Sequence, residues 1–290
     1  MPDAAVLYPG EMGCTMAKVL VAAGWRVSTH LWGPSLVCRA DAEAAGIVDL
    51  DSLDEAIATS DVVISLVPPS AAEATAEAAA TAARRRDRRP LYLDANSVSP
   101  GTMTAVAAAC AAAGLDCVDG AFIGSAAELG GRTRLCLSGP RAGELAAMLP
   151  EPFRASTLGP EIGAASGLKL AFAGFNKGLV ALFLAVLEAG VVAGAPDALL
   201  TWLRDFYPGT IETLERLLPT YPRHAARRAE ELDELARWLI DNECDEGCAV
   251  AARDVLRSVA DLGLDPGSDW TFADVLAAWT SRRPPAGASS

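Results

Sequence analysis

Residues 5–24 read AVLYPGEMGCTMAKVLVAAG, an apolar run that passes through Tyr8-Pro9-Gly10 into a segment of helical spacing that ends at Gly24. A short apolar run, a glycine-containing turn and a helical segment in this order are typical of a β-strand that leads into an α-helix. The N-terminus of such a helix binds anions, because its first backbone N–H groups have no partner within the helix. The N-terminal part of the chain is therefore expected to be an α/β nucleotide-binding domain.

The same alternation continues along the chain. Short β-branched runs, expected as strands, occur at 5–8, 26–31, 62–67, 91–94, 117–122 and 135–138. Alanine-rich helical segments separate them, for example at 12–23, 71–85 and 102–113. Strands that alternate with helices form a mostly parallel sheet covered on both faces. This pattern predicts a Rossmann domain, a doubly wound α/β fold.

Beyond Pro160 the strand signals stop. Residues 163–193 are expected to form one long apolar helix that joins the domains, followed by shorter helices across 199–281. Breaks between these helices are expected at Pro208, Pro219, Pro222 and Gly263. The sequence thus predicts a nucleotide-binding domain at 1–160, an all-α domain for substrate binding and dimerisation at 161–281, and a disordered tail at 282–290.

Composition excludes several function classes. Lys and Arg number 24 against 37 Asp and Glu, a formal net charge of −13, so no nucleic acid is expected as a partner. The N-terminus lacks the regions of a signal peptide, which predicts a cytoplasmic protein. The apolar segment 178–195 contains Glu188 and several glycines, which favours a buried helix and no membrane partner. The seven cysteines do not have the spacing of a disulfide framework, which predicts reduced thiols. Both histidines are distant in sequence from Cys244 and Cys248, which predicts no metal site.

The turn after the first strand resembles a dinucleotide-binding fingerprint. Gly10 can let the backbone approach a pyrophosphate, and Gly13 can let the helix pack closely on the strand. Tyr8 stands where the fingerprint has its first glycine, and we expect the following Pro9 to hold it in an extended conformation. An ordinary turn without a ligand is the alternative interpretation.

The region about 20 residues past these glycines bears on the choice of cofactor. Residues 30–35 read HLWGPS and contain no carboxylate to bind the ribose hydroxyls of NAD. Arg39 with the nearby Ser35 hydroxyl suits a 2′-phosphate instead, which favours NADP. Alternatively, Arg39 is an ordinary exposed helix residue.

Four segments in order resemble the β-hydroxyacid dehydrogenase superfamily, which includes 6-phosphogluconate dehydrogenase, 3-hydroxyisobutyrate dehydrogenase and the imine reductases. They are 8–20, 61–68, 94–100 and 163–169, and between them residues 118–125 occupy the place of the family's substrate loop. The departures from the family pattern include Asn96 and Ile123, each in place of a serine, Ser125 in place of a glycine and Ala173 in place of an asparagine. These changes look like the branch whose C-terminal half is a domain of unknown function.

The resemblance implies the roles of particular residues and a homodimer with active sites shared between the chains. The implied cofactor contacts are Tyr8, Pro9, Gly10, Glu11, Met12, Ser35, Arg39, Val67, Pro68 and Asn96. The implied substrate contacts are Ser97, Ile123, Gly124, Ser125, Phe172, Ala173, Asn176 and Lys177. For Asn96, Ser97, Gly124 and Ser125, turn formation alone is the alternative role, and Lys177 is alternatively an exposed lysine.

Lys169 is the candidate catalytic residue. Its neighbours Leu168, Leu170 and Phe172 place the ammonium in partly apolar surroundings, which lowers a lysine pKa towards neutrality. It matches the catalytic lysine of the family and can act as general acid and base on a small-molecule substrate. A lysine that only extends its stem along an apolar surface is the alternative.

The C-terminal part offers weaker signals. Trp202, Phe206, Tyr207 and His224 stand at helical spacing, which is more typical of a core than of a pocket. The acidic run from Glu230 to Glu234 predicts a solvated helix face. Helix residues 168–192 are apolar on nearly all sides, which predicts burial between two subunits.

Together these features predict an NADP-dependent oxidoreductase that transfers a hydride between the nicotinamide and a β-hydroxyacid or ketone, with Lys169 as general acid and base. An imine reductase acting on a cyclic or bulky imine is the alternative enzyme. A catalytically silent NADP-binding sensor or scaffold is the alternative outside the enzymes.

Overall fold

The structure is a computed structural model that describes residues 1–30, 36–265 and 267–282. The chain divides into two compact units, Met1–Lys169 and Leu170–Ser290. Ser35 and the expected tail lie outside the described residues, apart from Arg282.

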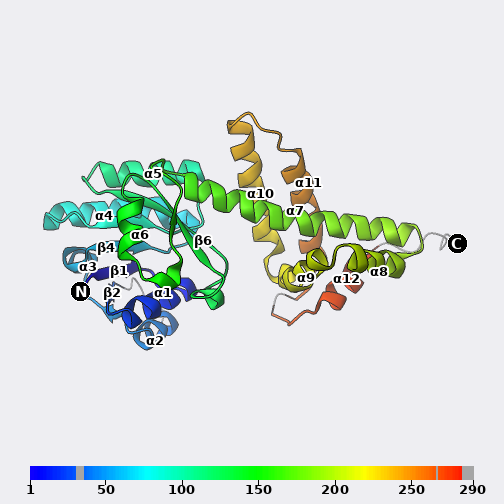
Figure 1. Cartoon of the computed structure of the whole chain (residues 1–290), viewed down its shortest axis with the longest axis horizontal. Helices are drawn as coiled ribbons and strands as arrows, with labels where there is room; N and C mark the ends of the chain where they lie inside the picture. Colours follow the sequence, from blue (N-terminus) through cyan, green and yellow to red (C-terminus); the bar gives the residue numbers. More distant parts are fainter. Residues whose placement is uncertain (31–35, 266, 283–290) are drawn as a thin grey trace. The chain divides into compact units, whose positions relative to one another are not determined.

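The first unit alternates strands and helices as predicted (Figure 1). Its strands are β1 (Asp3–Leu7), β2 (Arg26–Thr29), β3 (Val48–Asp49), β4 (Val62–Ser65), β5 (Leu91–Asp94), β6 (Cys117–Ile123), β7 (Arg134–Ser138) and β8 (Ser156–Thr157). Its α-helices are α1 (Glu11–Ala22), α2 (Leu36–Ala44), α3 (Leu53–Thr59), α4 (Ala72–Arg86), α5 (Pro100–Ala111) and α6 (Ala142–Met148). Short 3₁₀ turns are η1 (Pro69–Ala71), η2 (Ala126–Glu128) and η3 (Glu151–Phe153).

The sheet has the order β3-β2-β1-β4-β5-β6-β7-β8, and each pair of neighbours is parallel except β6 and β7. This confirms the predicted doubly wound, mostly parallel fold. The strands β3 and β8 were not predicted, because two residues leave no periodic signal. The strand order reverses direction between β1 and β4, where such sheets bind their ligands.

Alternate side chains of each strand enter two different cores. Val6 packs with α1, α2 and α6 on one face of the sheet, whereas Ala5 and Leu7 pack with α3, α4 and α5 on the other. Figure 1 shows these two helical layers with the sheet between them. At Gly13 a Cβ atom would lie 3.3 Å from Val6 Cγ1, so the glycine allows α1 to approach β1, as predicted.

The long helix α7 (Ala164–Val192) begins in the first unit. Its residue Ala165 is buried against Ala121 and Cys136 of the sheet. By length and composition α7 is the one described helix able to cross a membrane. Its first turns belong to the sheet core, and its later residues Val180 and Leu184 are fully buried in the second unit. These contacts are those of a helix that contributes to the core of both units.

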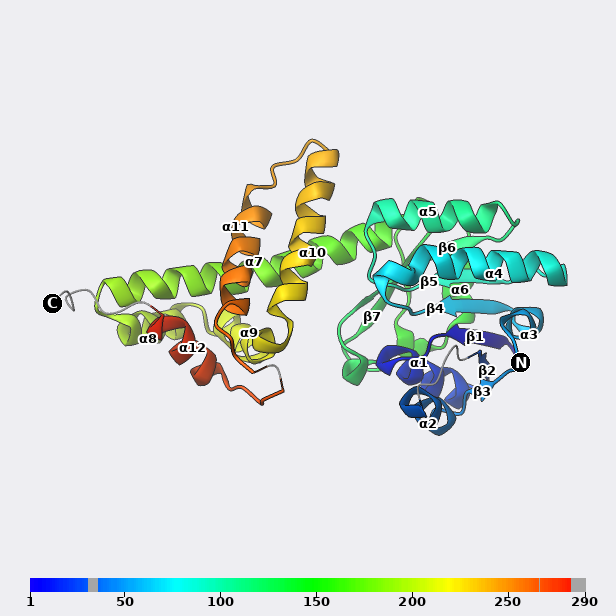
Figure 2. The ribbon, with the colours of Figure 1, turned by 180° about the vertical axis from the view of Figure 1, so that it is seen from behind.

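The second unit is entirely helical within the described residues. Besides α7 it contains α8 (Pro196–Phe206), α9 (Pro208–Leu217), η4 (Leu218–Thr220), α10 (Tyr221–Asp241), α11 (Gly247–Ala260) and α12 (Phe272–Ser281). The helices α10 and α11 lie side by side in both ribbon views (Figure 2). Trp279 of α12 is buried and donates its indole N–H to the Leu184 carbonyl of α7 at 2.9 Å.

Two details of this unit differ from the prediction. Pro222 lies in the first turn of α10 and starts that helix rather than breaking one, because a proline is tolerated where no intrahelical N–H is needed. An unpredicted break separates α10 from α11. The chain reverses there at Glu243, which has a left-handed φ of 56°. The residues before Glu243 have an ordinary helical sequence.

Candidate active site

The turn between β1 and α1 is built differently from the prediction at Tyr8. Its φ is 55°, a left-handed conformation, so the expectation that Pro9 keeps Tyr8 extended was wrong. The Gly10 N–H donates to the Tyr8 carbonyl at 2.8 Å and closes the turn. A tight turn at this point requires the positive φ that the fingerprint supplies with its first glycine, and this requirement overrides the local preference.

Gly10 leaves open space at the start of α1. An added Cβ would meet no atom within 4 Å, so the backbone there is accessible to a ligand. Gly10 is the N-terminal cap of α1, and Glu11 and Met12 are the first residues of the helix. Their backbone N–H groups lie at the positive end of the helix dipole, which suits a pyrophosphate. Pro9 contributes its carbonyl, which accepts from the Cys14 thiol at 3.2 Å and fixes the turn against the helix.

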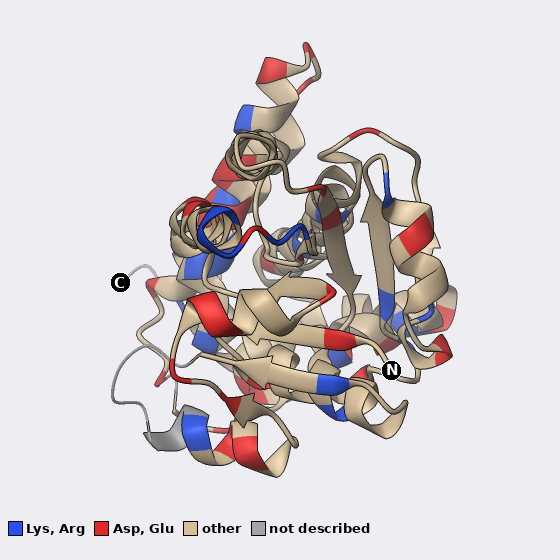
Figure 3. Ribbon diagram, turned by 90° about the vertical axis from the view of Figure 1, so that its left-hand side faces the viewer, with Lys and Arg blue, Asp and Glu red and all other residues tan. Residues whose placement is uncertain are grey.

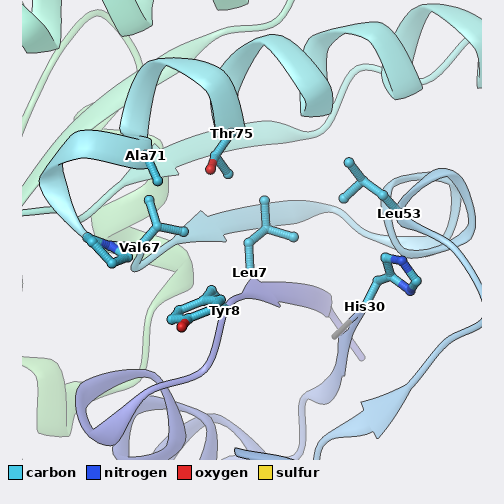
Figure 4. Close-up of a pocket in the computed structure, with 8 residues that line it drawn as sticks. Leu7, Tyr8, His30, Leu53, Val67, Ala71 and Thr75 are labelled. Carbon is cyan, nitrogen blue, oxygen red and sulfur yellow. The ribbon is translucent and has the colours of Figure 1, made fainter. Parts of the chain in front are cut away.

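A cavity of about 260 Å³ lies beside this turn (Figure 4). Its lining residues are Leu7, Tyr8, His30, Leu53, Val67, Pro68, Ala71 and Thr75. Figure 4 shows the Tyr8 ring on the side of Val67, with His30 and Leu53 at the other end. The cavity opens at the carboxyl ends of β1, β2 and β4, around the point where the strand order reverses. Of the predicted cofactor contacts, the structure brings Tyr8, Val67 and Pro68 together here.

His30 is a residue of this cavity that sequence reasoning missed. Its Nδ1 lies 2.9 Å from the Leu50 carbonyl oxygen, which can only accept, so Nδ1 is assigned as the protonated nitrogen. The signal that could have found it is its position directly after β2, where dinucleotide-binding folds place a ribose-binding side chain.

Arg39 lies on α2 and forms an ion pair with Asp49 of β3, with Nη1 2.7 Å from Oδ2. About half of the Arg39 side chain is exposed. A guanidinium has five N–H donors, so one carboxylate does not exhaust it. Arg39 is thus an exposed residue of α2, so the alternative of an ordinary exposed helix residue stays open beside the predicted cofactor contact, and the ion pair with Asp49 holds its side chain beside β3.

Asn96 is buried and bonded within the protein. Its Oδ1 accepts from the Val67 backbone N–H at 2.7 Å. Its Nδ2 donates to Ser65 Oγ at 3.0 Å and to Asp94 Oδ2 at 2.8 Å. Both amide hydrogens are thus engaged, and the side chain fixes the backbone of Val67 just after β4. Ser97, the next residue, is exposed.

A row of four polar residues crosses four neighbouring strands of the sheet, at the last residue of β4, β5 and β7 and within β6. Ser65, Asp94, Asp119 and Ser138 are paired in register on β4, β5, β6 and β7, and at most 1% of each is exposed. They lie on the face covered by α4 and α5, since Leu7 of β1 continues the row into that core. Buried polar groups need partners, and these find them in the Asn96 loop and in α7.

Asp119 and Ser138 bind the start of α7. Asp119 Oδ2 accepts from the backbone N–H groups of Gly163 at 3.0 Å and Ser166 at 3.1 Å. Its Oδ1 accepts from the Ser166 hydroxyl at 2.7 Å. Ser138 donates to Asp119 Oδ2 and accepts from the Ala165 N–H, both at 3.0 Å. The carboxylate therefore caps the N-terminus of the helix from within the sheet.

This cap positions Lys169, which follows Ser166 by one turn and is partly buried. Its ammonium lies near the Asp94 carboxylate and lowers the pKa of that group. Burial outweighs this effect and raises the pKa of Asp94 to about 6, with hydrogen bonds from Asn96 opposing the rise and the charge of Asp119 adding to it. The charge of Lys169 thus acts on a buried acid with a pKa of about 6 at the carboxyl end of β5.

The segment predicted to contact substrate after β6 forms a tight loop. Gly124 has a φ of 134°, and a Cβ there would lie 2.2 Å from Thr133 Oγ1, so only glycine fits. The Ser125 carbonyl accepts from Thr133 Oγ1 at 2.7 Å, and the Ser125 hydroxyl donates to Glu128 at 3.2 Å. Ile123 ends the strand and is partly buried, whereas Gly124 and Ser125 are exposed.

The remaining predicted contacts lie on the second-unit part of α7. Phe172 is exposed, and Ala173 and Asn176 are partly buried. Lys177 is buried, and its Nζ lies 2.7 Å from Glu231 Oε2 on α10. Burial lowers the pKa of Lys177 while Glu231 opposes that effect. The alternative of an exposed lysine is therefore wrong, and the ion pair commits this ammonium to the helical core.

Two other expectations for the helical part are also wrong. The acidic run on α10 is not simply solvated, because Glu231 pairs with Lys177 and Asp233 bridges Arg253 at 2.9 Å and Arg257 at 2.7 Å. The aromatic residues of α8 are not core residues. Trp202 and Phe206 are 63% and 77% exposed, and Tyr207 after the helix is 60% exposed.

The fold and this edge of the sheet define a dinucleotide-binding α/β protein with a helical second unit. Residues 5–145 match the family of NAD binding domains of 6-phosphogluconate dehydrogenase, and residues 192–259 match a domain of unknown function. The chain belongs to the β-hydroxyacid dehydrogenase superfamily, whose members are NAD(P)-dependent oxidoreductases. The predicted resemblance is thereby confirmed, and so is the assignment to a class of enzymes that use a nicotinamide dinucleotide.

Solved structures share this fold along the whole chain. A conserved hypothetical protein from Sinorhizobium meliloti is 25% identical, with a TM-score of 0.78 over 98% of this chain and 97% of that one. The 3-hydroxyisobutyrate dehydrogenase of Mycobacterium tuberculosis is 19% identical, with a TM-score of 0.76 over 98% and 100%. An imine reductase from Myxococcus stipitatus in complex with NADP⁺ is 19% identical, with a TM-score of 0.59 over 96% and 99%. The last two show the fold alone. No curated protein matches the sequence significantly.

Proposed function

We propose that this protein is an NADP-dependent oxidoreductase that transfers a hydride between the nicotinamide and the carbonyl carbon of a β-hydroxyacid or ketone. The observation that carries the proposal is the place of Lys169. The cap from Asp119 fixes the start of the helix that carries Lys169, and the charge of Lys169 acts on Asp94. The other lysine of the first unit, Lys18, is far away in the sequence. A proton donor at that edge is what carbonyl reduction needs in addition to the cofactor.

The residues around the turn after β1 fit a dinucleotide. The open space at Gly10 and the N-terminus of α1 suit the pyrophosphate, and the cavity beside Tyr8 and His30 suits the nucleoside part. When bound, the cofactor supplies or accepts the hydride. Val67, held by Asn96, and Pro68 line the same cavity from the end of β4.

Lys169 moves the proton in this mechanism. During reduction its ammonium donates a proton to the substrate oxygen, which becomes a hydroxyl group. During oxidation its neutral amine takes the hydroxyl proton. Gly124 and Ser125 are exposed and offer backbone groups to a carboxylate of the substrate, and Ile123 supplies an apolar contact at the end of β6.

The preference for NADP rests on Arg39. Its guanidinium is held by Asp49 next to the end of β3, and it retains donors for a 2′-phosphate. One solved relative, the imine reductase, is a complex with NADP⁺. Acidic and basic residues are interspersed over the ribbon in Figure 3, a distribution that favours a small-molecule substrate over a polyanion. We place the protein in the cytoplasm.

The test combines a substrate panel with two variants of Lys169. Purified protein is mixed with NADPH and β-ketoacids, aldehydes, ketones and cyclic imines, and cofactor oxidation is followed by absorbance. We expect turnover with a carbonyl compound. Lys169→Met keeps the stem and the packing but not the proton, so it should lower kcat about 10²- to 10⁴-fold, as should Lys169→Ala. NADPH affinity should stay within twofold of wild type.

Lys18→Met is the matched control, because Lys18 is exposed on α1 and has no proposed role. It should retain the wild-type kcat. Turnover of imines alone would favour the alternative of an imine reductase. NADPH binding without turnover of any of these classes would favour a silent sensor or scaffold. Near wild-type kcat in Lys169→Met would exclude Lys169 as the acid.

We also propose that the protein forms a homodimer with shared active sites. One side of α7 supports the core of the second unit, while Phe175 and Leu182 on the same helix are 68% and 63% exposed. Trp202 and Phe206 of α8 add exposed aromatic surface. Apolar surface of this extent is typical of a protein interface. Light scattering should give twice the mass of the 30.0 kDa chain.

Leu182→Asp tests the assembly and should yield a monomer, because a buried charge at an interface is costly. Val48→Asp is the control, since Val48 is 59% exposed on β3 of the first unit, away from α7 in sequence. It should remain a dimer. A wild-type protein that scatters as a monomer at micromolar concentration contradicts the proposal.

A further inference from the structure

We propose that Asp94 is the positioning residue of Lys169: its buried carboxylate holds the ammonium at the end of β5 and keeps it protonated. The inference deepens the proposed function and rests on it for the catalytic role of Lys169. Asp94 itself is 1% exposed and contacts no open surface, so it acts through the lysine.

The placement follows from the register of the sheet. Asp94 and Asp119 are directly paired on neighbouring parallel strands, which lie about 4.8 Å apart. Asp119 binds the backbone and hydroxyl of Ser166, and Lys169 follows by three residues on the same face of α7. The turn of α7 that carries Lys169 therefore follows directly on the turn that is bound to the strand neighbour of Asp94, and the charge of Lys169 acts on the Asp94 carboxylate.

The two carboxylates of the row are satisfied very differently. Asp119 receives four hydrogen bonds, from Ser138, Gly163 and both donors of Ser166. Asp94 receives two hydrogen bonds from Asn96, at 3.1 Å from the backbone and 2.8 Å from the side chain. A buried carboxylate with neutral donors on one side needs a cation on the other. Lys169 is the cation whose charge acts on it.

The other ionisable groups around Asp94 cannot take this part. Tyr92 on the same strand and Cys117 on β6 both have a pKa raised well above the usual range, so both are neutral. Cys110 of α5 adjoins Cys117. Asp119 repels the Asp94 charge. Among the described groups that act on Asp94, Lys169 alone is of opposite charge.

The pair explains how the lysine can serve as an acid near neutral pH. Partly apolar surroundings favour the neutral amine, whereas an adjacent carboxylate favours the ammonium. Asp94 restores the proton that burial would remove. In the direction of reduction, Lys169 then starts each cycle charged, and its proton goes to the substrate oxygen.

The experiment measures proton affinity without substrate. The lysines of the chain are Lys18, Lys169 and Lys177, so acetylation by trace acetic anhydride can be followed at each by peptide mass spectrometry from pH 7 to 11. Only the neutral amine reacts. In Asp94→Asn the labelling midpoint of Lys169 should move to lower pH by about one unit or more, since a paired charge is lost. The midpoint of the exposed Lys18 should not move.

Ser65→Ala is the matched control, because it removes a neutral hydrogen-bond partner of Asn96 and leaves the charge of Asp94 in place. Its Lys169 midpoint should equal that of wild type. A second measurement covers the case in which Asp94→Asn does not fold. By reciprocity, Lys169→Met should raise the pKa of Asp94, observed by carboxyl carbon NMR.

The outcomes separate this inference from the proposed function. An unchanged Lys169 midpoint in folded Asp94→Asn, or an unchanged Asp94 titration in Lys169→Met, overturns the inference whatever the enzyme does. A shifted midpoint together with full activity of Lys169→Met retains the pair and removes the proposed catalytic role. If the inference and the proposed function are both correct, the basic limb of the pH profile of reduction should move to lower pH in Asp94→Asn. The size of this move should equal that of the labelling midpoint.

Discussion

Asp119 and Ser166, 47 residues apart in the sequence, are joined by two hydrogen bonds: the Ser166 hydroxyl donates to Oδ1 at 2.7 Å and its backbone N–H donates to Oδ2 at 3.1 Å. This pair attaches the first turn of α7 to β6. Because Lys169 lies one turn further on, the position of the candidate acid depends on a carboxylate that never reaches the surface.

Asp119→Ala should destabilise the protein by about 3 kcal/mol or more, because buried backbone N–H groups of Gly163 and Ser166 lose their acceptor. Ser166→Ala removes a hydroxyl donor alone and should cost about 1.5 kcal/mol. Urea unfolding of both variants and of the double variant gives their coupling, which should be about 1 kcal/mol or more. The control Asp116→Ala breaks an exposed ion pair with Arg141 and should cost less than about 1 kcal/mol. Additive effects would contradict the described bonds.

The titration of Asp94 should appear in the pH dependence of stability. Its folded pKa, about 6, is above the ordinary 3.8, so the folded state binds the proton more tightly. Its stabilising contribution is complete below pH 4 and is lost as the pH rises to about 6. Asp94→Asn has no such loss. Its stability relative to wild type should therefore rise by about 2 kcal/mol between pH 4.5 and 7.5. Urea unfolding at four pH values checks this, and parallel curves would show that Asp94 titrates normally.

What the sequence could predict was local. The helix after β1, the closely packed Gly13 and the lysine near the start of α7 each depend on residues within one element or one turn. The polar row was not predictable in this way, because Ser65, Asp94, Asp119 and Ser138 become neighbours only through strand register. Lys177 shows the same limit. It lies two turns after Lys169 and was predicted as a substrate contact, but Glu231 on another helix forms an ion pair with it.

Tyr8 shows a local preference overridden by its context. The rule for residues before proline predicts an extended Tyr8, but the turn needs a positive φ. An L-residue there is strained, by about 1–2 kcal/mol. Tyr8→Gly should therefore be about 1 kcal/mol more stable than Tyr8→Ala, which also lacks the ring but keeps the strain. Urea unfolding of the two variants makes the comparison. Equal stabilities would mean that the turn relaxes without cost.

The same two variants distinguish the effect of the turn conformation on cofactor affinity from the effect of the Tyr8 ring. Since Tyr8 lines the cavity proposed for the nucleoside, both should bind NADPH more weakly than wild type and to a similar extent. Isothermal titration measures the affinities. If Tyr8→Gly alone restores wild-type affinity, the ring makes no contact with the cofactor and the conformation of the turn is what matters.

Arg39 and Asp49 together test the cofactor preference. Arg39→Ala should weaken NADPH binding about tenfold or more, because a charge-assisted contact to the 2′-phosphate is worth about 1.5–3 kcal/mol. NADH, which lacks that phosphate, should bind as before. Asp49→Asn removes the carboxylate that lies 2.7 Å from the guanidinium, so NADPH should bind more tightly and NADH unchanged. The gain should shrink as salt is raised, since the interaction is exposed and screened. If Arg39→Ala lowers the affinities for NADPH and NADH equally, Arg39 supports the structure of this edge of the sheet and does not select the cofactor. If the wild-type protein binds NADH more tightly than NADPH, the proposed preference for NADP is wrong.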